Sequence, residues 1–229
     1  MKPDKIVVIG ASTGGPKTLV DLFSELTPDV NIPIVVAIHC PFNIADTISD
    51  GIARNLKIVS KMEGEFIKCK TASHKEDLAN RIIYFSPGRK HTQITKNIIS
   101  HCLYIDDEPS GTLFRPSVDI LFSSASNVFK SNVMGIIMTG LNTGKDGVEG
   151  CKRIKEKGGV VIAQDQKTSI CFGMPKNIID KGLADYILPT KIIAKKIEMF
   201  SKGLIKTGGI ITANNSGSIT AQRYSMESR

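Results

Sequence analysis

A short apolar run followed by a glycine-rich turn lies near the amino terminus and limits what this chain can fold into. Residues 6–9 read Ile-Val-Val-Ile, which is typical of a β-strand buried on both faces. Residues 10–16 read Gly-Ala-Ser-Thr-Gly-Gly-Pro, whose glycines permit a tight turn and whose proline suits the first turn of a helix. Ser12 is therefore predicted to lie on a sharp strand-to-helix turn, beside backbone N–H groups and the positive end of a helix dipole.

Three interpretations of this turn are open. Residues 10–14 satisfy the G-x-S-x-G pattern of a nucleophile elbow, which exposes a reactive serine above a sheet. The turn could instead bind a phosphate, because a helix N-terminus attracts anions. It could also be an ordinary turn in which Ser12 caps the helix. Neither G-x-G-x-x-G nor the Lys-Ser/Thr ending of a P-loop is present, which argues against a nucleotide-binding α/β protein.

Length and composition narrow the class of protein. A chain of 229 residues that is 41% hydrophobic can bury one full core, and no apolar run is long enough to span a bilayer. The amino terminus lacks the apolar segment of a signal peptide. Five cysteines without C-x-x-C spacing fit a reducing cytoplasm better than a disulfide framework. We therefore expect a cytoplasmic protein without an integral membrane segment.

Charge and metal-ligand spacing suggest a protein partner rather than a metal or a nucleic acid. The formal net charge is +8, but the basic residues are dispersed and there is no tryptophan, which disfavours a single-strand nucleic-acid platform. We favour an acidic protein partner. The cysteine–histidine pairs 39–40 and 101–102 are adjacent, and neighbouring side chains of a strand point to opposite faces, so no metal site is predicted.

The periodicity predicts an α/β fold with a doubly wound, mostly parallel sheet and helices on both faces. From 57 to 106 the apolar runs become short and alternate, which we interpret as an inserted antiparallel hairpin region. Residues 184–188 are predicted to form an edge strand. We expect one catalytic domain over 1–200 and a tail over 201–229 that does not fold. The other predicted strands are 6–9, 33–38, 133–138 and 159–164, and the predicted helices are 17–26, 45–56, 117–129, 147–157, one short helix after 172–175, and 191–200.

Three polar residues follow predicted strands at the edge where open parallel sheets bind ligands. Ser12, His39 and Asp146 each come at most one loop after an apolar strand. These are the residue types of acyl transfer, in which an imidazole takes the serine proton and a carboxylate orients the imidazole. Taken singly, His39 could be structural and Asp146 could cap a helix, but their coincidence at strand ends favours a shared site.

The same residues lie in motifs that resemble the catalytic domain of the chemotaxis receptor protein-glutamate methylesterase (CheB-type). The matching segments are 10–16, His39 with Pro41, Ser-Pro-Gly-Arg-Lys-His at 86–91, Arg-Pro-Ser-Val-Asp-Ile-Leu-Phe at 115–122, Thr139-Gly140 with Asp146-Gly147, and Ala163-Gln164 with Phe-Gly-Met-Pro at 172–175.

The resemblance implies a hydrolase that removes methyl groups from glutamate methyl esters on chemoreceptor signalling helices, and that can also deamidate receptor glutamines. It implies Ser12, His39 and Asp146 as the catalytic triad, and no cofactor or metal. It also implies oxyanion and substrate-binding roles for a second set: Thr13, Gly14, Gly15, Leu141 and Met174.

Three departures from the family pattern bear on this expectation. Ile38 and Cys40 flank the histidine where the family has Gln and Met, and the loop before Asp146 is two residues longer, with Leu141 in place of Met. Only five residues precede the first strand, so if the chain is complete no receiver domain regulates it in cis. A separate receiver-domain protein is then left open as a partner. The alternative is a catalytically impaired receptor- or regulator-binding module of the same fold.

Overall fold

The computed structural model describes residues 2–39, 67–142 and 145–205, the single residues 47, 50, 51 and 54, and the backbone of 211–213 and 219–221. The helix predicted over 45–56 falls largely outside these residues, although the four single residues described within it are helical. Among the described residues, none of the helices combines the length and the apolar composition of a membrane span.

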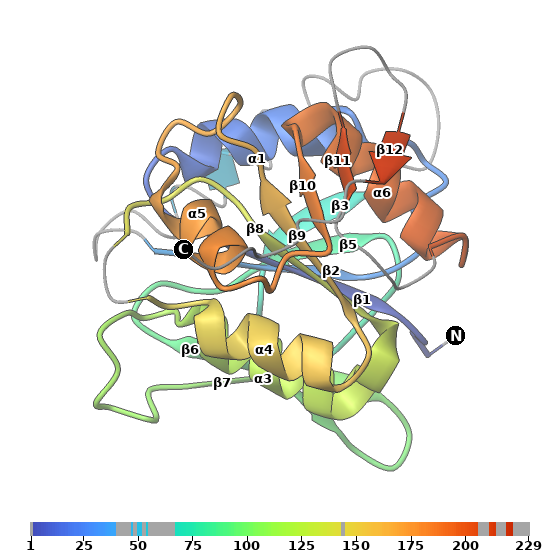
Figure 1. Ribbon diagram of the computed structural model, residues 1–229. Coiled ribbons are helices and arrows are strands. Elements are labelled where there is room, and N and C mark those ends of the chain that lie inside the picture. Colours follow the sequence, from blue (N-terminus) through green and yellow to red (C-terminus); the bar gives the residue numbers. More distant parts are fainter. Residues whose placement is uncertain are drawn as a thin grey trace.

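A nine-stranded sheet forms the centre of the molecule, in the order β12-β11-β10-β9-β8-β1-β2-β5-β3 (Figure 1). Every neighbouring pair is parallel except β11 with β12. Its strands are β1 Ile6–Ala11, β2 Ile34–Ile38, β3 Lys68–Thr71, β5 Ile82–Phe85, β8 Val133–Ile137, β9 Val160–Gln164, β10 Tyr186–Leu188, β11 Ile211–Ala213 and β12 Ile219–Ala221.

Helices cover both faces of this sheet, which confirms the predicted doubly wound fold. Figure 1 shows α1 and α6 over one face and α3 and α4 over the other. The helices are α1 Gly15–Ser24, α3 Val118–Phe129, α4 Val148–Glu156, α5 Gly173–Asp180 and α6 Thr190–Ser201, with a 3-10 turn at Lys130–Asn132.

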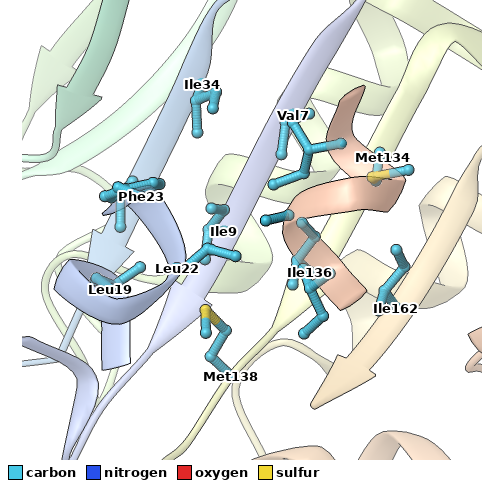
Figure 2. Packing of buried hydrophobic residues seen from close by; sticks show 14 of the residues in the cluster. Val7, Ile9, Leu19, Leu22, Phe23, Ile34, Met134, Ile136, Met138 and Ile162 are labelled. Atoms are coloured by element: carbon cyan, nitrogen blue, oxygen red, sulfur yellow. The ribbon is translucent and has the colours of Figure 1, made fainter. Parts of the chain in front are cut away.

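The central strands are apolar throughout because both of their faces are buried. In β1, Val7 and Ile9 point into the layer packed against α1 and α6, whereas Ile6 and Val8 point into the layer packed against α3 and α4. Figure 2 shows the first of these layers, which includes Ile9 of β1 and Leu22 of α1. This two-sided burial holds the strand ends in fixed positions.

Of the antiparallel insertion predicted over 57–106, residues 57–66 lie outside the described part of the chain, and residues 67–106 are antiparallel only in part. A separate three-stranded antiparallel sheet does form, from β4 Glu76–Asp77, β6 His91–Lys96 and β7 His101–Asp106. However, β3 and β5 join the main sheet in parallel register with β2. The prediction was wrong for these two strands, because short apolar runs do not reveal which sheet they pair with.

Two further expectations differ at the other end of the sheet. β10 is not an edge strand, since β11 pairs with it in parallel. β11 and β12 also lie within 201–229, where the sequence favours no folded structure. The domain boundary at residue 200 stays a prediction, although α6 ends at Ser201, close to it.

Candidate active site

Ser12 lies in a three-residue turn between the end of β1 and the start of α1. The N–H of Gly15 donates to the carbonyl oxygen of Ser12 over 2.7 Å and closes the turn. Gly14 takes a left-handed conformation, with φ of 82°, which a residue with a side chain rarely adopts. The turn leaves Ser12 partly exposed at the carboxyl end of the sheet.

His39 follows β2 and lies next to Ser12 across two hydrogen-bonded strands. Ala11 pairs with Ile38, and the N–H of His39 donates to the carbonyl oxygen of Ala11 over 2.9 Å. The imidazole stacks on Phe114 with ring centroids 4.1 Å apart and planes within 6° of parallel. Phe114 was not identified from the sequence, since a single aromatic residue in a loop carries no signal of what it will pack against.

The imidazole of His39 is hydrogen-bonded to the carboxylate of Asp146, with 2.7 Å between Nε2 and Oδ2. Both side chains are nearly buried, at 7% and 8% exposure. A carboxylate can only accept, so Nε2 carries the proton and Nδ1 of the neutral ring is left to accept another. Within the described part of the chain, neither Nδ1 of His39 nor Oγ of Ser12 has a hydrogen-bond partner.

Asp146 is held by four donors, three of which come from the start of α3. Oδ1 accepts from the Ser117 hydroxyl and the Asp119 N–H, each over 2.9 Å, and Oδ2 accepts from the Val118 N–H over 2.7 Å in addition to His39. Burial alone raises the pKa of this carboxyl, but the hydrogen bonds to His39 and to the helix N–H groups outweigh it and lower the pKa. Asp146 is therefore an oriented and ionised partner for the imidazole.

Thr139, two residues after the end of β8, connects the serine turn to the neighbouring loops by hydrogen bonds. Its carbonyl oxygen accepts the N–H of Ser12 over 2.9 Å, and its hydroxyl donates to the carbonyl oxygen of Thr13 over 2.9 Å. The same hydroxyl accepts the N–H of Cys171, while the N–H of Thr139 donates to the buried side chain of Gln164 over 2.8 Å. These contacts fix the Thr13–Gly14 peptide against β8.

Backbone N–H groups around Ser12 divide into those used by the fold and those that are free. The N–H of Gly15 bonds Ser12 and that of Gly140 bonds the Cys171 carbonyl oxygen over 2.8 Å. The N–H groups of Thr13, Gly14 and Leu141 donate to no acceptor among the described residues. Gly15 thus builds the turn, and the other three can receive a developing negative charge.

The two remaining predicted binding residues, Leu141 and Met174, lie on the Gly140 side of Ser12 and differ in how much of each is exposed. Leu141 is 51% exposed, and Ile170, which lies against Gly14, is 55% exposed. Met174 is only 4% exposed and lies beneath Gly140. No three His, Cys, Asp or Glu side chains of the described ranges gather as metal ligands would.

Comparison with known proteins agrees with this geometry. Residues 7–197 match the family described as CheB methylesterase. The chain is 35% identical over 199 residues to the protein-glutamate methylesterase/protein-glutamine glutaminase of Maricaulis maris, and 36% identical over 196 residues to that of Thermotoga maritima. These alignments cover 87% and 85% of this chain but 47% and 54% of the relatives, so the chain spans about half the length of the curated relatives it matches.

A solved structure shows the same fold. The crystal structure of the Thermotoga maritima CheB methylesterase catalytic domain superposes with a TM-score of 0.76 and 34% sequence identity. The match covers 85% of this chain and 97% of that domain. Sequence and fold agree over the segment that carries Ser12, His39 and Asp146, and the chain therefore belongs to the CheB methylesterase family.

Proposed function

We propose that this protein is a serine esterase that hydrolyses glutamate methyl esters on chemoreceptor signalling helices, with Ser12, His39 and Asp146 as its catalytic triad. The observation that carries the proposal is the 2.7 Å hydrogen bond between His39 and Asp146, directly beside the serine turn. This bond orients an imidazole whose free nitrogen is the acceptor that a serine nucleophile needs.

The chemistry follows from the proton on Nε2. Nδ1 of His39 takes the Ser12 hydroxyl proton as Oγ attacks the ester carbonyl carbon, and Asp146 stabilises the imidazolium that results. The tetrahedral intermediate collapses, and the imidazolium returns the proton to the departing methoxide, which leaves as methanol. A water molecule, activated by the same nitrogen, then hydrolyses the acyl-enzyme to glutamate and Ser12. Attack on a glutamine amide by the same steps releases ammonia. No step calls on a metal or coenzyme.

The negative oxygen of the intermediate would be held by the free N–H groups of Thr13, Gly14 and Leu141. Thr13 and Gly14 lie at the N-terminus of α1, where the helix dipole also favours negative charge. Leu141 approaches from the neighbouring loop after β8. Two donors that converge on one oxygen form the arrangement that acyl-transfer sites use most often.

The rim of the site is suited to a helical protein substrate. Leu141, in the loop after β8, and Ile170, which lies against Gly14 of the serine turn, present exposed apolar surface against which the apolar residues of a receptor helix can pack. The net charge of +8 favours an acidic partner. We place the reaction in the cytoplasm, with a receiver-domain protein as a candidate regulator.

Methanol release from a methylated chemoreceptor fragment tests this function. We expect wild-type protein to release methanol, alone or on addition of a receiver-domain protein, and Ser12→Ala to release none while keeping its fold by circular dichroism. Ser24→Ala is the matched control, since Ser24 is the last residue of α1, where its hydroxyl donates to the Val20 carbonyl oxygen and has no other partner among the described residues. Activity in Ser12→Ala would refute the nucleophile, and an inactive wild type would favour the non-catalytic binding module.

A further inference from the structure

Two carboxyl groups bind the N-termini of α3 and α4 crosswise. Asp146 lies two residues before α4, yet it accepts N–H groups from the first two residues of α3. Asp119 is the second residue of α3, yet its Oδ1 accepts the N–H of Gly147 over 2.9 Å and of Gly150 over 2.7 Å at the start of α4. Each helix start is thus capped by a carboxyl group that belongs to the start of the other.

This arrangement acts directly on the residue that holds His39. Gly147 follows Asp146 in the chain, so the hydrogen bond from its N–H to Asp119 fixes the peptide unit that carries the Asp146 carboxylate. The backbone N–H of Asp119 also donates to Asp146 Oδ1. Asp119 therefore holds Asp146 both through its side chain and through its main chain, although it makes no contact with His39.

The pKa of Asp119 fits a residue that supports Asp146 rather than a second, charged base. Burial is the largest influence on Asp119 and raises the pKa of its carboxyl to about 7, a rise to which the nearby negative charge of Asp146 adds. A carboxyl that holds its proton up to neutral pH still accepts two N–H groups through Oδ1. It does so without placing a full second negative charge beside Asp146.

We propose that Asp119 is a positioning residue that keeps Asp146 within hydrogen-bonding distance of His39 by binding the N–H groups of Gly147 and Gly150. The proposal rests on the proposed function in that the reaction it serves is ester hydrolysis at Ser12. The sequence placed Asp119 in a family motif without assigning it a role.

Substitutions at Asp119 distinguish the role of its Oδ1 as a hydrogen-bond acceptor from the role of its charge. Asp119→Asn retains an Oδ1 that accepts both N–H groups, and we expect its kcat for methanol release to stay within about threefold of the wild type. Asp119→Ala loses both bonds, and we expect kcat to fall about 10- to 100-fold with KM within twofold, as for removal of a group that acts only on the transition state. Should Asp119→Ala fail to fold, Asp119→Glu, whose carboxyl is displaced by one methylene, is expected to show the same fall.

Glu149→Ala is the matched control, because Glu149 is an exposed acid in the first turn of α4, the helix whose N–H groups Asp119 binds, and it pairs with Arg153 instead of the site. It should leave kcat unchanged. An Asp119→Ala kcat within twofold of the wild type would overturn the proposal. So would an Asp119→Asn variant as slow as Asp119→Ala, since the acceptor would then not be what matters.

A double-mutant cycle tests whether Asp119 acts through Asp146. In an Asp146→Asn background, Asp119→Ala should cost no further activity, whereas an additive loss would overturn the proposal. A readout that needs no activity is the low-field proton resonance of the His39–Asp146 hydrogen bond, assigned by its loss in Asp146→Asn. It should persist in Asp119→Asn and vanish in Asp119→Ala.

The two proposals can fail separately. If the wild type released no methanol, the proposed function would fail. If the His39–Asp146 resonance persisted in Asp119→Ala, the positioning role of Asp119 would be refuted.

Discussion

Gly140 separates the side chains of Ser12 and Met174, and the space at its Cα admits a hydrogen atom only. A Cβ placed there would lie 2.8 Å from the Cβ of Ser12 and 2.3 Å from the Sδ of Met174. The Met174 side chain is flexible and can move aside, but Ser12 is fixed by backbone hydrogen bonds on both sides of the turn. The contact with Ser12 therefore decides what a substitution does to the reaction.

We expect Gly140→Ala to lower kcat by roughly 100-fold, since a displacement of a reacting group by about 1 Å can have that effect. Overpacking should also lower the free energy of unfolding by about 1–3 kcal/mol. In a Met174→Ala background the stability penalty should shrink while the rate penalty remains. Gly111→Ala is the control, because nothing lies within 4 Å of a Cβ at Gly111. Recovery of the rate in the double variant would show that Met174, not Ser12, is displaced.

Residue types and strand ends predict the three residues that we propose as the triad, but not the groups that hold them. Ser12, His39 and Asp146 follow strands β1, β2 and β8, which are neighbours in the sheet. Open parallel sheets bind ligands at the carboxyl ends of their strands, and this predicts that the three residues lie at one site. Phe114 and Asp119 act through contacts between segments distant in sequence. Those contacts form only in the packed structure, and no local sequence pattern predicts them.

The carboxylate of Asp146 depends on the N-terminus of helix α3 for most of its hydrogen bonds. Ser117 caps this helix: its Oγ accepts the N–H of Ile120 over 3.3 Å and donates to Asp146 over 2.9 Å. One hydroxyl thus serves both the helix and the site. The loop before Asp146 is two residues longer than the family pattern, yet the bond to His39 is still made, because α3 supplies three of the four donors.

Ser117→Ala should therefore have two measurable effects. We expect a loss of about 1 kcal/mol in unfolding free energy from the missing cap, and a fall in kcat of roughly tenfold from the loosened carboxylate. Ser123→Ala, on the same helix and with no hydroxyl partner among the described residues, should change neither by much. Urea unfolding and methanol release measure the two effects. Equal losses in both variants would contradict a specific role for Ser117.

The elements were predictable to different degrees for a physical reason. β1, β2, β8 and β9 are apolar runs buried on both faces, a pattern with few alternatives once helices alternate with them. β3 alternates between exposed and partly buried residues, as a hairpin strand would. Its parallel pairing with β5 is decided by contacts between strands in the sheet, which the sequence of β3 does not reveal. β11 lies in a glycine- and asparagine-rich segment, so its pairing with β10 could not be predicted from composition.

The whole molecule is assembled around a topological switch, since the chain leaves β1 toward β2 on one side and later returns to β8 on the other. The two layers of core fix these three strands from both faces. At their carboxyl ends the fold buries two carboxyl groups, Asp146 and Asp119, whose pKa values move in opposite directions. The stability of the molecule should therefore depend on pH through Asp119 in a range where Asp146 contributes a constant amount.

The sign of this dependence follows from proton binding in the two states. In the unfolded chain the Asp119 carboxyl ionises near its ordinary pKa of 3.8, whereas in the folded protein its pKa is about 7. Between about pH 4 and pH 7 the folded state holds a proton that the unfolded state has released, so the contribution of Asp119 to stability falls as pH rises and levels off above 7. The pKa of Asp146 is lowered instead, so its contribution is fully present above about pH 4 and is lost only below it.

Asp119→Asn removes this titration and retains the acceptor for Gly147 and Gly150. We expect the unfolding free energy of Asp119→Asn, relative to the wild type, to increase steadily from pH 4.5 to 7.5 and to stay level from there to pH 8.5. Urea unfolding at several pH values measures this difference, with Glu149→Gln as the control for loss of one carboxylate near the start of α4. A difference independent of pH over this range would mean that Asp119 is already ionised in the folded protein, and that the fold holds two adjacent negative charges beside His39.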